Sequence, residues 1–210
     1  MKLRTLMNDD PILPDTCYHI YNRAHGSEKM FLEEANYRYF LVLLQKHLLP
    51  YFDVYAYVLM PNHFHLVVRT KTLEELTQIT KPKKVSLHSR NPFSQVFSNF
   101  CNAYTKAFNK WHKRMGSLFM RPFKRVEIEN EFHLMTAIRY VHNNPVHHGY
   151  CTQIDEWHFS SYNSFLTKNK TNLQRTLVLE YFGGQIAFLE FHNQAVLCKK
   201  NGDYLKDWDS

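Results

Sequence analysis

The pattern that most constrains this fold is a pair of strand-like runs joined by a two-residue turn. Residues 52–60 and 63–70 are both rich in valine, leucine and aromatic side chains, as strands are. Pro61 and Asn62 lie between the two runs and are typical of a tight turn. The pattern therefore predicts an antiparallel hairpin.

Two histidines, His63 and His65, lie on the second run. Because alternate side chains of a strand share a face, both imidazoles should point the same way as Val67 and Arg69. The intervening residues should point to the core: Phe64, Leu66 and Val68. Two imidazoles side by side on a strand are half of a metal site. The alternative is a pair of core histidines that satisfy their own hydrogen bonds.

The other elements follow from hydrophobic spacing and helix breakers. They are a strand over 16–23, a helix over 33–49, a helix over 93–114, a strand over 121–129, and a helix from its cap Asn130 to about 143, ended by Pro145 and Gly149. This order is the split βαβ pattern with one added helix. It predicts an α+β, ferredoxin-like βαββαβ sandwich. We expect a four-stranded antiparallel sheet with helices on one face, and the added C-terminal helix packed near the histidine strand.

The rest of the chain is less regular. Residues 1–15 are an irregular lead-in, 71–92 are polar and basic, and 151–210 form an extension with a helical stretch near 173–182. We expect one domain over 1–150 and an extension over 151–210 that packs on or beside it.

Charge and aromatic content bear on the partner. The 210 residues include 26 Lys and Arg against 19 Asp and Glu, a net charge of +7, and 15% are aromatic. A basic, aromatic-rich surface suits a polyanion, and single-stranded nucleic acid in particular. A basic globular enzyme with a tyrosine-rich core fits composition equally well. The four cysteines form no close pair, and no signal or membrane-spanning segment is visible, so we expect a cytoplasmic protein without membrane contact.

Tyr140 stands apart from the apolar stripe of its predicted helix. At about 100° per residue it clusters with the polar residues His133, Thr136 and Asn144. Asn144 is four residues later, so the two side chains share a face. An ordinary, partly buried helix tyrosine is the alternative.

Two sequence blocks carry a family resemblance, residues 60–67 (MPNHFHLV) and 139–146 (RYVHNNPV). Three more support it: 18–23 (YHIYNR), 117–124 (SLFMRPFK) and 157–162 (WHFSSY). Together they cover roughly residues 16–165 in order. The chain resembles the single-tyrosine HUH transposases, and within them the branch called REP-associated tyrosine transposases.

The resemblance implies roles for four residues. His63 and His65 match the metal-binding histidines, Tyr140 matches the nucleophile, and Asn144 matches the third polar ligand. It implies a divalent cofactor, Mg²⁺ or Mn²⁺, and a transposase activity on hairpin-bearing single-stranded DNA such as repeat or insertion-sequence ends. Such an enzyme is an endonuclease and strand transferase that forms a 5′-phosphotyrosine, and the resemblance implies association with the bacterial nucleoid.

The chemistry is consistent with these residue types. A tyrosine hydroxyl, with a free pKa of about 10, needs a nearby cation or base to attack a phosphate. Two histidines and an amide oxygen suit Mg²⁺ or Mn²⁺ better than a closed zinc site. With one tyrosine, strand exchange needs a second protomer, as in a homodimer, or sequential steps.

Further residues are candidates for contacts to DNA or to the site. The predicted phosphate contacts are Asn22, Arg23, Lys81, Lys83, Lys84, Arg121, Lys124 and Arg125. His19 and His133 are candidates for support of the metal ligands, and a structural role is equally open for each. Two other functions remain open: a non-catalytic nucleic-acid-binding protein that keeps the fold, and a metal-dependent phosphodiesterase that uses water in place of Tyr140.

Overall fold

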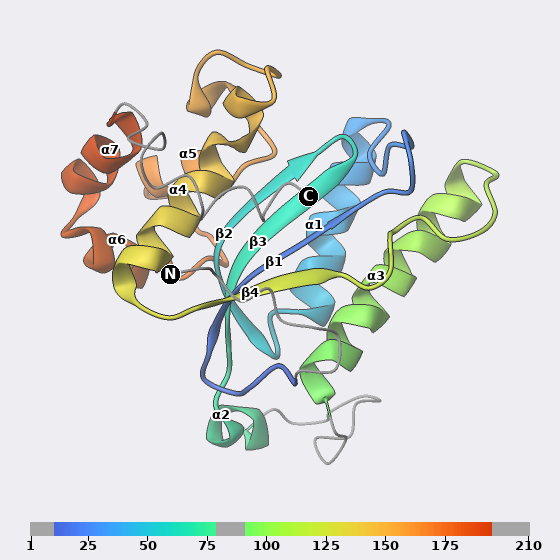
Figure 1. Cartoon of the computed structure of the whole chain (residues 1–210), viewed down its shortest axis with the longest axis horizontal. Coiled ribbons are helices and arrows are strands. Elements are labelled where there is room, and N and C mark those ends of the chain that lie inside the picture. Colours follow the sequence, from blue (N-terminus) through green and yellow to red (C-terminus); the bar gives the residue numbers. More distant parts are fainter. Residues whose placement is uncertain (1–10, 79–90, 195–210) are drawn as a thin grey trace.

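The computed structural model describes residues 11–78 and 91–194 of the chain. Its centre is a four-stranded antiparallel sheet of β1 (Cys17–Arg23), β2 (Phe52–Met60), β3 (His63–Thr70) and β4 (Lys124–Ile128), in the order β2-β3-β1-β4 (Figure 1). The α+β class, the hairpin and the four antiparallel strands are confirmed. The ferredoxin-like assignment and the division at residue 150 stay predictions.

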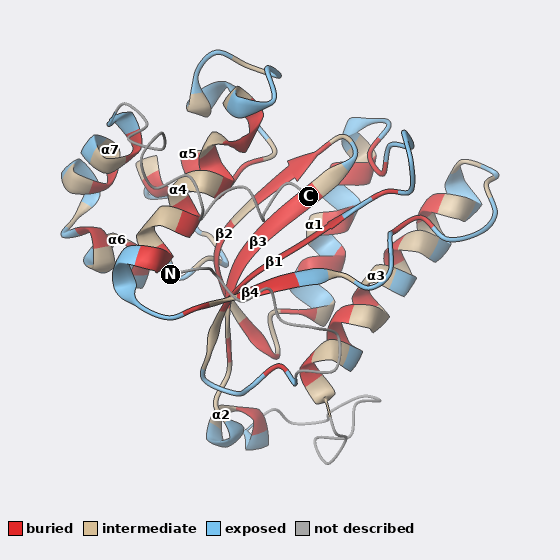
Figure 2. Cartoon of the chain, in the orientation of Figure 1, coloured by how far each residue is buried: buried red, intermediate tan, exposed pale blue. Residues whose placement is uncertain are grey.

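Helices α1 (Glu34–His47) and α3 (Pro92–Trp111) cover one face of the sheet, to the right in Figure 1. Every third or fourth residue of α3 is a buried aromatic, so one side of the helix forms a continuous apolar stripe. These rings pack against the strand residues Phe64, Leu66 and Val68. The face predicted to be core is therefore buried beneath α1 and α3. Figure 2 shows that most residues of the central strands are buried.

Helix α4 (Glu131–His147) covers the other face of the sheet and contacts β2 and β3. The Asn130 side chain accepts a hydrogen bond from the His133 N–H and caps this helix, as predicted. The short helical turn η1 (Ile154–Glu156) and the helices α5 (Tyr162–Leu166), α6 (Arg175–Phe182) and α7 (Gln185–Asn193) follow. They share a buried cluster with α4 and the sheet, which includes Val67, Val126, Phe165 and Phe188.

The end of α4 and one additional short helix differ from the prediction for identifiable reasons. Helix α4 continues through Pro145 to His147, where we expected it to end near 143. A proline removes one N–H from the helix, and in the last turn this costs little, because the His148 N–H still caps the Asn144 carbonyl at 3.0 Å. The predicted polar segment contains α2 (Leu73–Thr77), which begins with a reciprocal capping box between Thr72 and Glu75.

The segment 157–161 runs along the free edge of β2. The Ser161 N–H donates to the Tyr57 carbonyl at 2.9 Å, and the Leu59 N–H donates to the Phe159 carbonyl at 2.9 Å. The indole of Trp157 donates to the Leu59 carbonyl at 3.0 Å. This block therefore ties the extension to the sheet. No helix within the described ranges is long and apolar enough to cross a membrane.

Candidate active site

The pairing of β1 with β3 gathers histidines on the face that α4 covers. Tyr21 lies opposite His65, and Arg23 lies opposite His63, so the odd-numbered residues of both strands share that face. His19 Nε2 and His65 Nδ1 are 2.9 Å apart, and the Tyr21 ring stacks on both imidazoles. The predicted support of His65 by His19 therefore has a direct geometric basis.

Helix α4 brings Tyr140 to this cluster. The tyrosine ring meets His65 edge-on with ring centroids 5.5 Å apart, and it meets His19 at 5.8 Å. Tyr140 is half-buried, so its ring borders the histidines while part of the residue faces solvent. The predicted nucleophile and the predicted metal ligands, 75 residues apart in sequence for His65 and Tyr140, form one cluster.

Asn144, one helical turn after Tyr140, completes the predicted ligand set. Its side chain is fully buried, and its Oδ1 lies 2.8 Å from His63 Nε2. His63 Nδ1 lies 2.8 Å from Asn62 Oδ1, and this contact orients the ring. The proline turn at residues 61–62 thus both closes the hairpin and positions the His63 ring.

Burial keeps the inner histidines neutral. It lowers the pKa of His65 well below the ordinary value, and the neighbouring His19, His63 and His148 lower it further. Burial also lowers the pKa of His19 to about 3, with a contribution from His133. A neutral imidazole retains a nitrogen lone pair, which is the form that binds metal.

The donor set fits a divalent ion. His63 meets two amide oxygens, and a ring with a single proton can donate to only one of them. If Nδ1 donates to Asn62, the lone pairs of Nε2 and of the Asn144 oxygen face each other. Their 2.8 Å separation is close to the about 3 Å between adjacent ligands of Mg²⁺. His65 uses Nδ1 for His19, so Nε2 is its remaining ligand atom. Within the described ranges, Asn144 Nδ2 is also buried without a hydrogen-bond partner.

The third candidate metal ligand is the amide oxygen of Asn144, and a site that includes an amide oxygen is easy to overlook. Among the described residues, no group of three or more His, Cys, Asp or Glu side chains is arranged to hold a metal ion. An ion here would therefore depend on the Asn144 oxygen. Amide oxygens are ordinary ligands for hard cations.

Sequence reasoning missed His148 as part of this site. Its ring centroid lies 5.0 Å from that of His63, at the C-terminal cap of α4, and the side chain is exposed. The available signal was its spacing, because it follows Asn144 by four residues and so shares its face. His133 lies two turns before Tyr140, where its Nδ1 accepts from the Glu129 N–H at 3.4 Å.

The predicted phosphate contacts divide between the two faces of the sheet. Lys124 lies opposite Tyr21 and is exposed on the tyrosine face. Arg125 lies opposite Ile20, is only 3% exposed, and belongs to the face covered by α3. Arg23 and Arg121 are exposed, while the Asn22 amide donates to the Met120 carbonyl at 3.1 Å. Lys81, Lys83 and Lys84 lie outside the described residues, and contact with DNA stays a prediction for the whole set.

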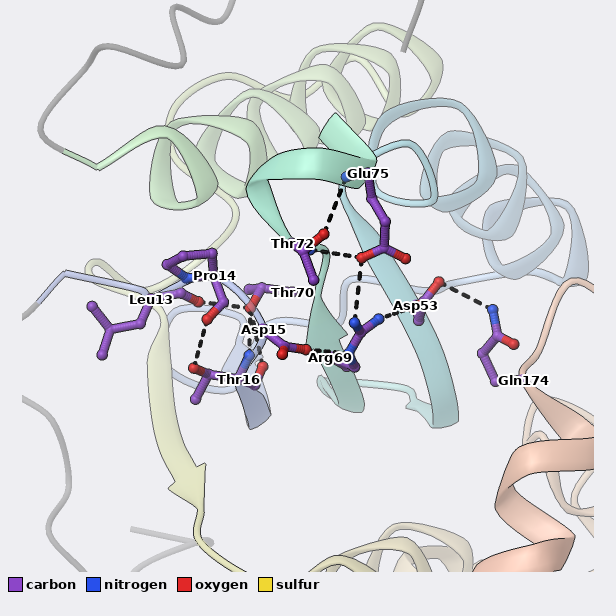
Figure 3. Close-up of polar contacts among 10 residues, drawn as sticks. All are labelled: Leu13, Pro14, Asp15, Thr16, Asp53, Arg69, Thr70, Thr72, Glu75 and Gln174. Atoms are coloured by element: carbon purple, nitrogen blue, oxygen red, sulfur yellow. Dashed lines mark hydrogen bonds and ion pairs between the residues drawn. The ribbon is translucent and has the colours of Figure 1, made fainter. Parts of the chain in front are cut away.

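Arg69 lies on the same strand as His63 and His65, but its contacts stabilise the fold. Its guanidinium contacts carboxylates of Asp15 at 2.8 Å, Asp53 at 2.7 Å and Glu75 at 3.3 Å (Figure 3). These three partners come from the lead-in to β1, from β2 and from α2. The arginine therefore joins three segments at the end of the sheet away from Tyr140.

Comparison with known proteins gives a curated and a structural match. No family model matches the chain. A curated Haemophilus influenzae protein named as a REP-associated tyrosine transposase is 23% identical over 111 residues, which is 53% of this chain and 59% of that protein. The solved structure of a REP-associated tyrosine transposase bound to a REP hairpin superposes with a TM-score of 0.57 at 16% identity, over 78% of this chain and 86% of that one. The curated match relates this chain to the REP-associated tyrosine transposases, and the structural match shows that the chain shares the fold of the solved structure.

Proposed function

We propose that this protein is a metal-dependent transposase that cuts and rejoins single-stranded DNA, with Tyr140 as its nucleophile. One observation carries the proposal: the Tyr140 ring lies 5.5 Å from His65, in the cluster where His63 Nε2 meets Asn144 Oδ1 at 2.8 Å. A nucleophile beside side chains that can bind a divalent ion is an arrangement suited to phosphoryl transfer.

His63, His65 and Asn144 would hold Mg²⁺ or Mn²⁺. When bound, the ion supplies a Lewis acid that stabilises the charge developing on the scissile phosphate. The contacts His19 to His65 and Asn62 to His63 fix the two rings, and fixed second partners strengthen metal binding by histidine.

Tyr140 performs the transfer itself. Its hydroxyl oxygen attacks phosphorus, the bond from phosphorus to the 3′-oxygen breaks, and the proton lost by the tyrosine ends on the departing 3′-hydroxyl. The phosphate then links Tyr140 to the 5′ side of the break. Attack of another 3′-hydroxyl on this linkage reverses the step and joins a new pair of ends.

The substrate that we propose is single-stranded DNA that carries a hairpin. The structural neighbour is bound to a REP hairpin, and this chain has a net charge of +7. Exposed Lys124 and Arg23 flank the histidine cluster at the ends of paired strands. Their charge would neutralise phosphates, and such binding weakens as salt rises.

The direct test is covalent capture with Tyr140→Phe. Loss of one hydroxyl should abolish the covalent protein–DNA band on a denaturing gel and leave hairpin binding within about twofold, because the ring and its packing remain. Tyr39→Phe is the matched control, since Tyr39 is partly exposed on α1 over the other face. An adduct that persists in Tyr140→Phe would assign the nucleophile elsewhere. No adduct from the unaltered protein with Mn²⁺ would favour the non-catalytic binder, and cleavage without adduct would favour water as nucleophile.

A further inference from the structure

His148 lies beside the proposed metal ligands at the C-terminal end of α4. Its ring centroid is 5.0 Å from that of His63, and the His65 centroid is 5.1 Å from the same ring. Two imidazoles that bind one ion at about 2.1 Å, roughly at a right angle, have ring centres about 5 Å apart. His148 is therefore as close to His63 as two imidazole ligands of a single ion would be.

The backbone at the end of α4 fixes where the His148 side chain starts. The His148 N–H donates to the Asn144 carbonyl at 3.0 Å, four residues earlier. Gly149 then ends the helix with a φ of +70°, and its N–H donates to the Val146 carbonyl at 3.0 Å. Residues four apart on a helix share a face, and histidines at this spacing are a common metal-binding pair. The end of the helix thus presents Asn144 and His148 on the same side.

The His148 side chain is exposed, whereas those of His65 and Asn144 are buried. The described histidines are not arranged as a three-histidine metal site, so the His148 ring has to turn to reach an ion. Exposed side chains change rotamer readily, and only the ring has to move because the backbone already lies in place. An ion held by His63, His65 and Asn144 would therefore be within reach of a reoriented His148.

A third imidazole would change which ion the site prefers. Imidazole nitrogen suits transition metals, whereas Mg²⁺ prefers oxygen ligands and keeps several of its waters. Two histidines and the Asn144 oxygen can serve either kind of ion. With His148 added, nitrogen atoms outnumber the oxygen, and the set favours Mn²⁺ over Mg²⁺.

We propose that His148 is a fourth protein ligand of the divalent ion and that it makes the site prefer Mn²⁺ to Mg²⁺. The protein then supplies three imidazole nitrogens and one amide oxygen. This inference rests on the proposed function, to which it adds a ligand and a metal preference.

Metal titrations of the DNA-free protein test the ligand without any cleavage. Calorimetry measures Mn²⁺ directly and Mg²⁺ by competition with Mn²⁺. His148→Ala should lower Mn²⁺ affinity about tenfold and leave Mg²⁺ affinity within about twofold, because a nitrogen ligand contributes little to Mg²⁺ binding. His147→Ala is the matched control, since it removes the neighbouring exposed histidine from the same end of α4 and should change neither affinity.

Two further measurements distinguish a ligand from a residue that only supports the fold. Pulsed EPR of bound Mn²⁺ should detect three coupled imidazole nitrogens in the unaltered protein and two in His148→Ala. His148→Gln exchanges the nitrogen for an amide oxygen at similar reach, so it should lower Mn²⁺ affinity and preserve or raise Mg²⁺ affinity. Melting temperatures close to that of the unaltered protein show that the variants fold.

Several results would overturn the proposal. His148→Ala could weaken both metals equally, which is the signature of a structural role, or it could leave the nitrogen count unchanged. An equal loss of Mn²⁺ affinity in His147→Ala would indicate general binding to surface histidines. Failure of the unaltered protein to bind Mn²⁺ would also reject His148 as a ligand.

The outcomes stay separate from those of the proposed function. A protein that binds Mn²⁺ through three imidazoles but forms no covalent adduct would support His148 as a ligand and reject the nuclease. A protein that forms the adduct, and whose His148→Ala variant keeps the original preference for Mn²⁺, would support the nuclease and reject the fourth ligand.

Discussion

At the scale of single residues, Asn144 is where the structure bears most directly on the proposed metal site. Its oxygen lies 2.8 Å from His63 Nε2, and its amide nitrogen is buried with no partner among the described residues. A cation between the oxygen and Nε2 would accept a lone pair from each of these two atoms. Without a cation, the same contact is a hydrogen bond in which His63 Nε2 donates, or in which the amide, turned over, donates to Nε2.

Asn144→Ala should therefore lower Mn²⁺ affinity about 10–100-fold, because an uncharged ligand is lost while both histidines remain. Asn144→Asp should restore or exceed the original affinity, since a carboxylate is a stronger ligand for a hard cation. Calorimetric titration with Mn²⁺ measures both. Asn143→Ala is the control, because the Asn143 amide donates to the Arg139 carbonyl within its own helix. Equal losses in Asn143→Ala and Asn144→Ala would remove Asn144 from the ligand set.

At the scale of single elements, Arg69 is a charged residue whose ion pairs stabilise the fold. Its side chain is 22% exposed and that of Asp53 is 14% exposed, so water only partly screens the pair. Arg69→Met should lower the free energy of unfolding by about 1–3 kcal/mol, because three carboxylates lose their shared partner. Urea unfolding measures the change. Arg38→Met removes an exposed pair with Glu34 on α1 and should cost only about 0.3–0.5 kcal/mol. Similar losses in both variants would mean that the three-carboxylate cluster adds no stability beyond a surface pair.

Helix α7 contacts α4, the helix that carries Tyr140, through a buried pair of histidines. His192 Nε2 and His142 Nδ1 are 2.9 Å apart, and His192 Nδ1 donates to the Phe188 carbonyl at 2.8 Å. Burial lowers the pKa of His192 to about 4. The positive charge of Arg139 on α4 also lowers this pKa, whereas the hydrogen bond to the Phe188 carbonyl raises it. His142 is also buried, with a pKa lowered well below the ordinary value. The pair is therefore neutral in the folded protein at pH 7.

This pair makes stability depend on pH. The unfolded chain binds a proton at His192 near its ordinary pKa of about 6.5, and the folded chain does so only near 4. The unfolded state thus holds more protons between these values, so stability is full above about pH 6.5 and falls as the pH drops toward 4. The melting temperature should drop over this window in the unaltered protein and less steeply in His192→Gln. His158→Gln, at an exposed histidine, should keep the original slope. Identical slopes in all three proteins would exclude His192 as the source.

The elements and the site differed in how far the sequence could predict them. Alternation in β3 was enough to place His63 and His65 on one face, and a spacing of four was enough to pair Tyr140 with Asn144. The split of Lys124 and Arg125 between two faces could not be foreseen, because it depends on the register between β4 and β1. The end of α4 was missed because the proline rule is weak in a last turn, and α2 was missed although its capping box is visible in residues 72–75.

At the scale of the whole molecule, α4, the helix that carries Tyr140, is packed between the sheet and the C-terminal helices. The sheet lies beneath it, and α5, α6 and α7 pack on it with a shared apolar cluster (Figure 1). His142 Nε2 also meets Ser161 Oγ at 2.8 Å, and that same oxygen accepts from the Tyr57 N–H of β2 at 2.9 Å. Movement of α4 away from its own sheet would expose this cluster and break these contacts together.

We expect the proposed reaction centre to be assembled within a single chain, because α4 is held against its own sheet. A 1:1 mixture of Tyr140→Phe and His63→Ala proteins should give no more covalent adduct than the two variants give separately, even at concentrations where copies associate. The gel assay for the adduct measures this, with each variant mixed with unaltered protein as the control. Recovery of adduct in the mixture would show that a tyrosine from one copy reaches the histidines of another. Without such recovery, each folded chain is a complete cutting unit, and the joining of two DNA ends is a succession of events at a single tyrosine.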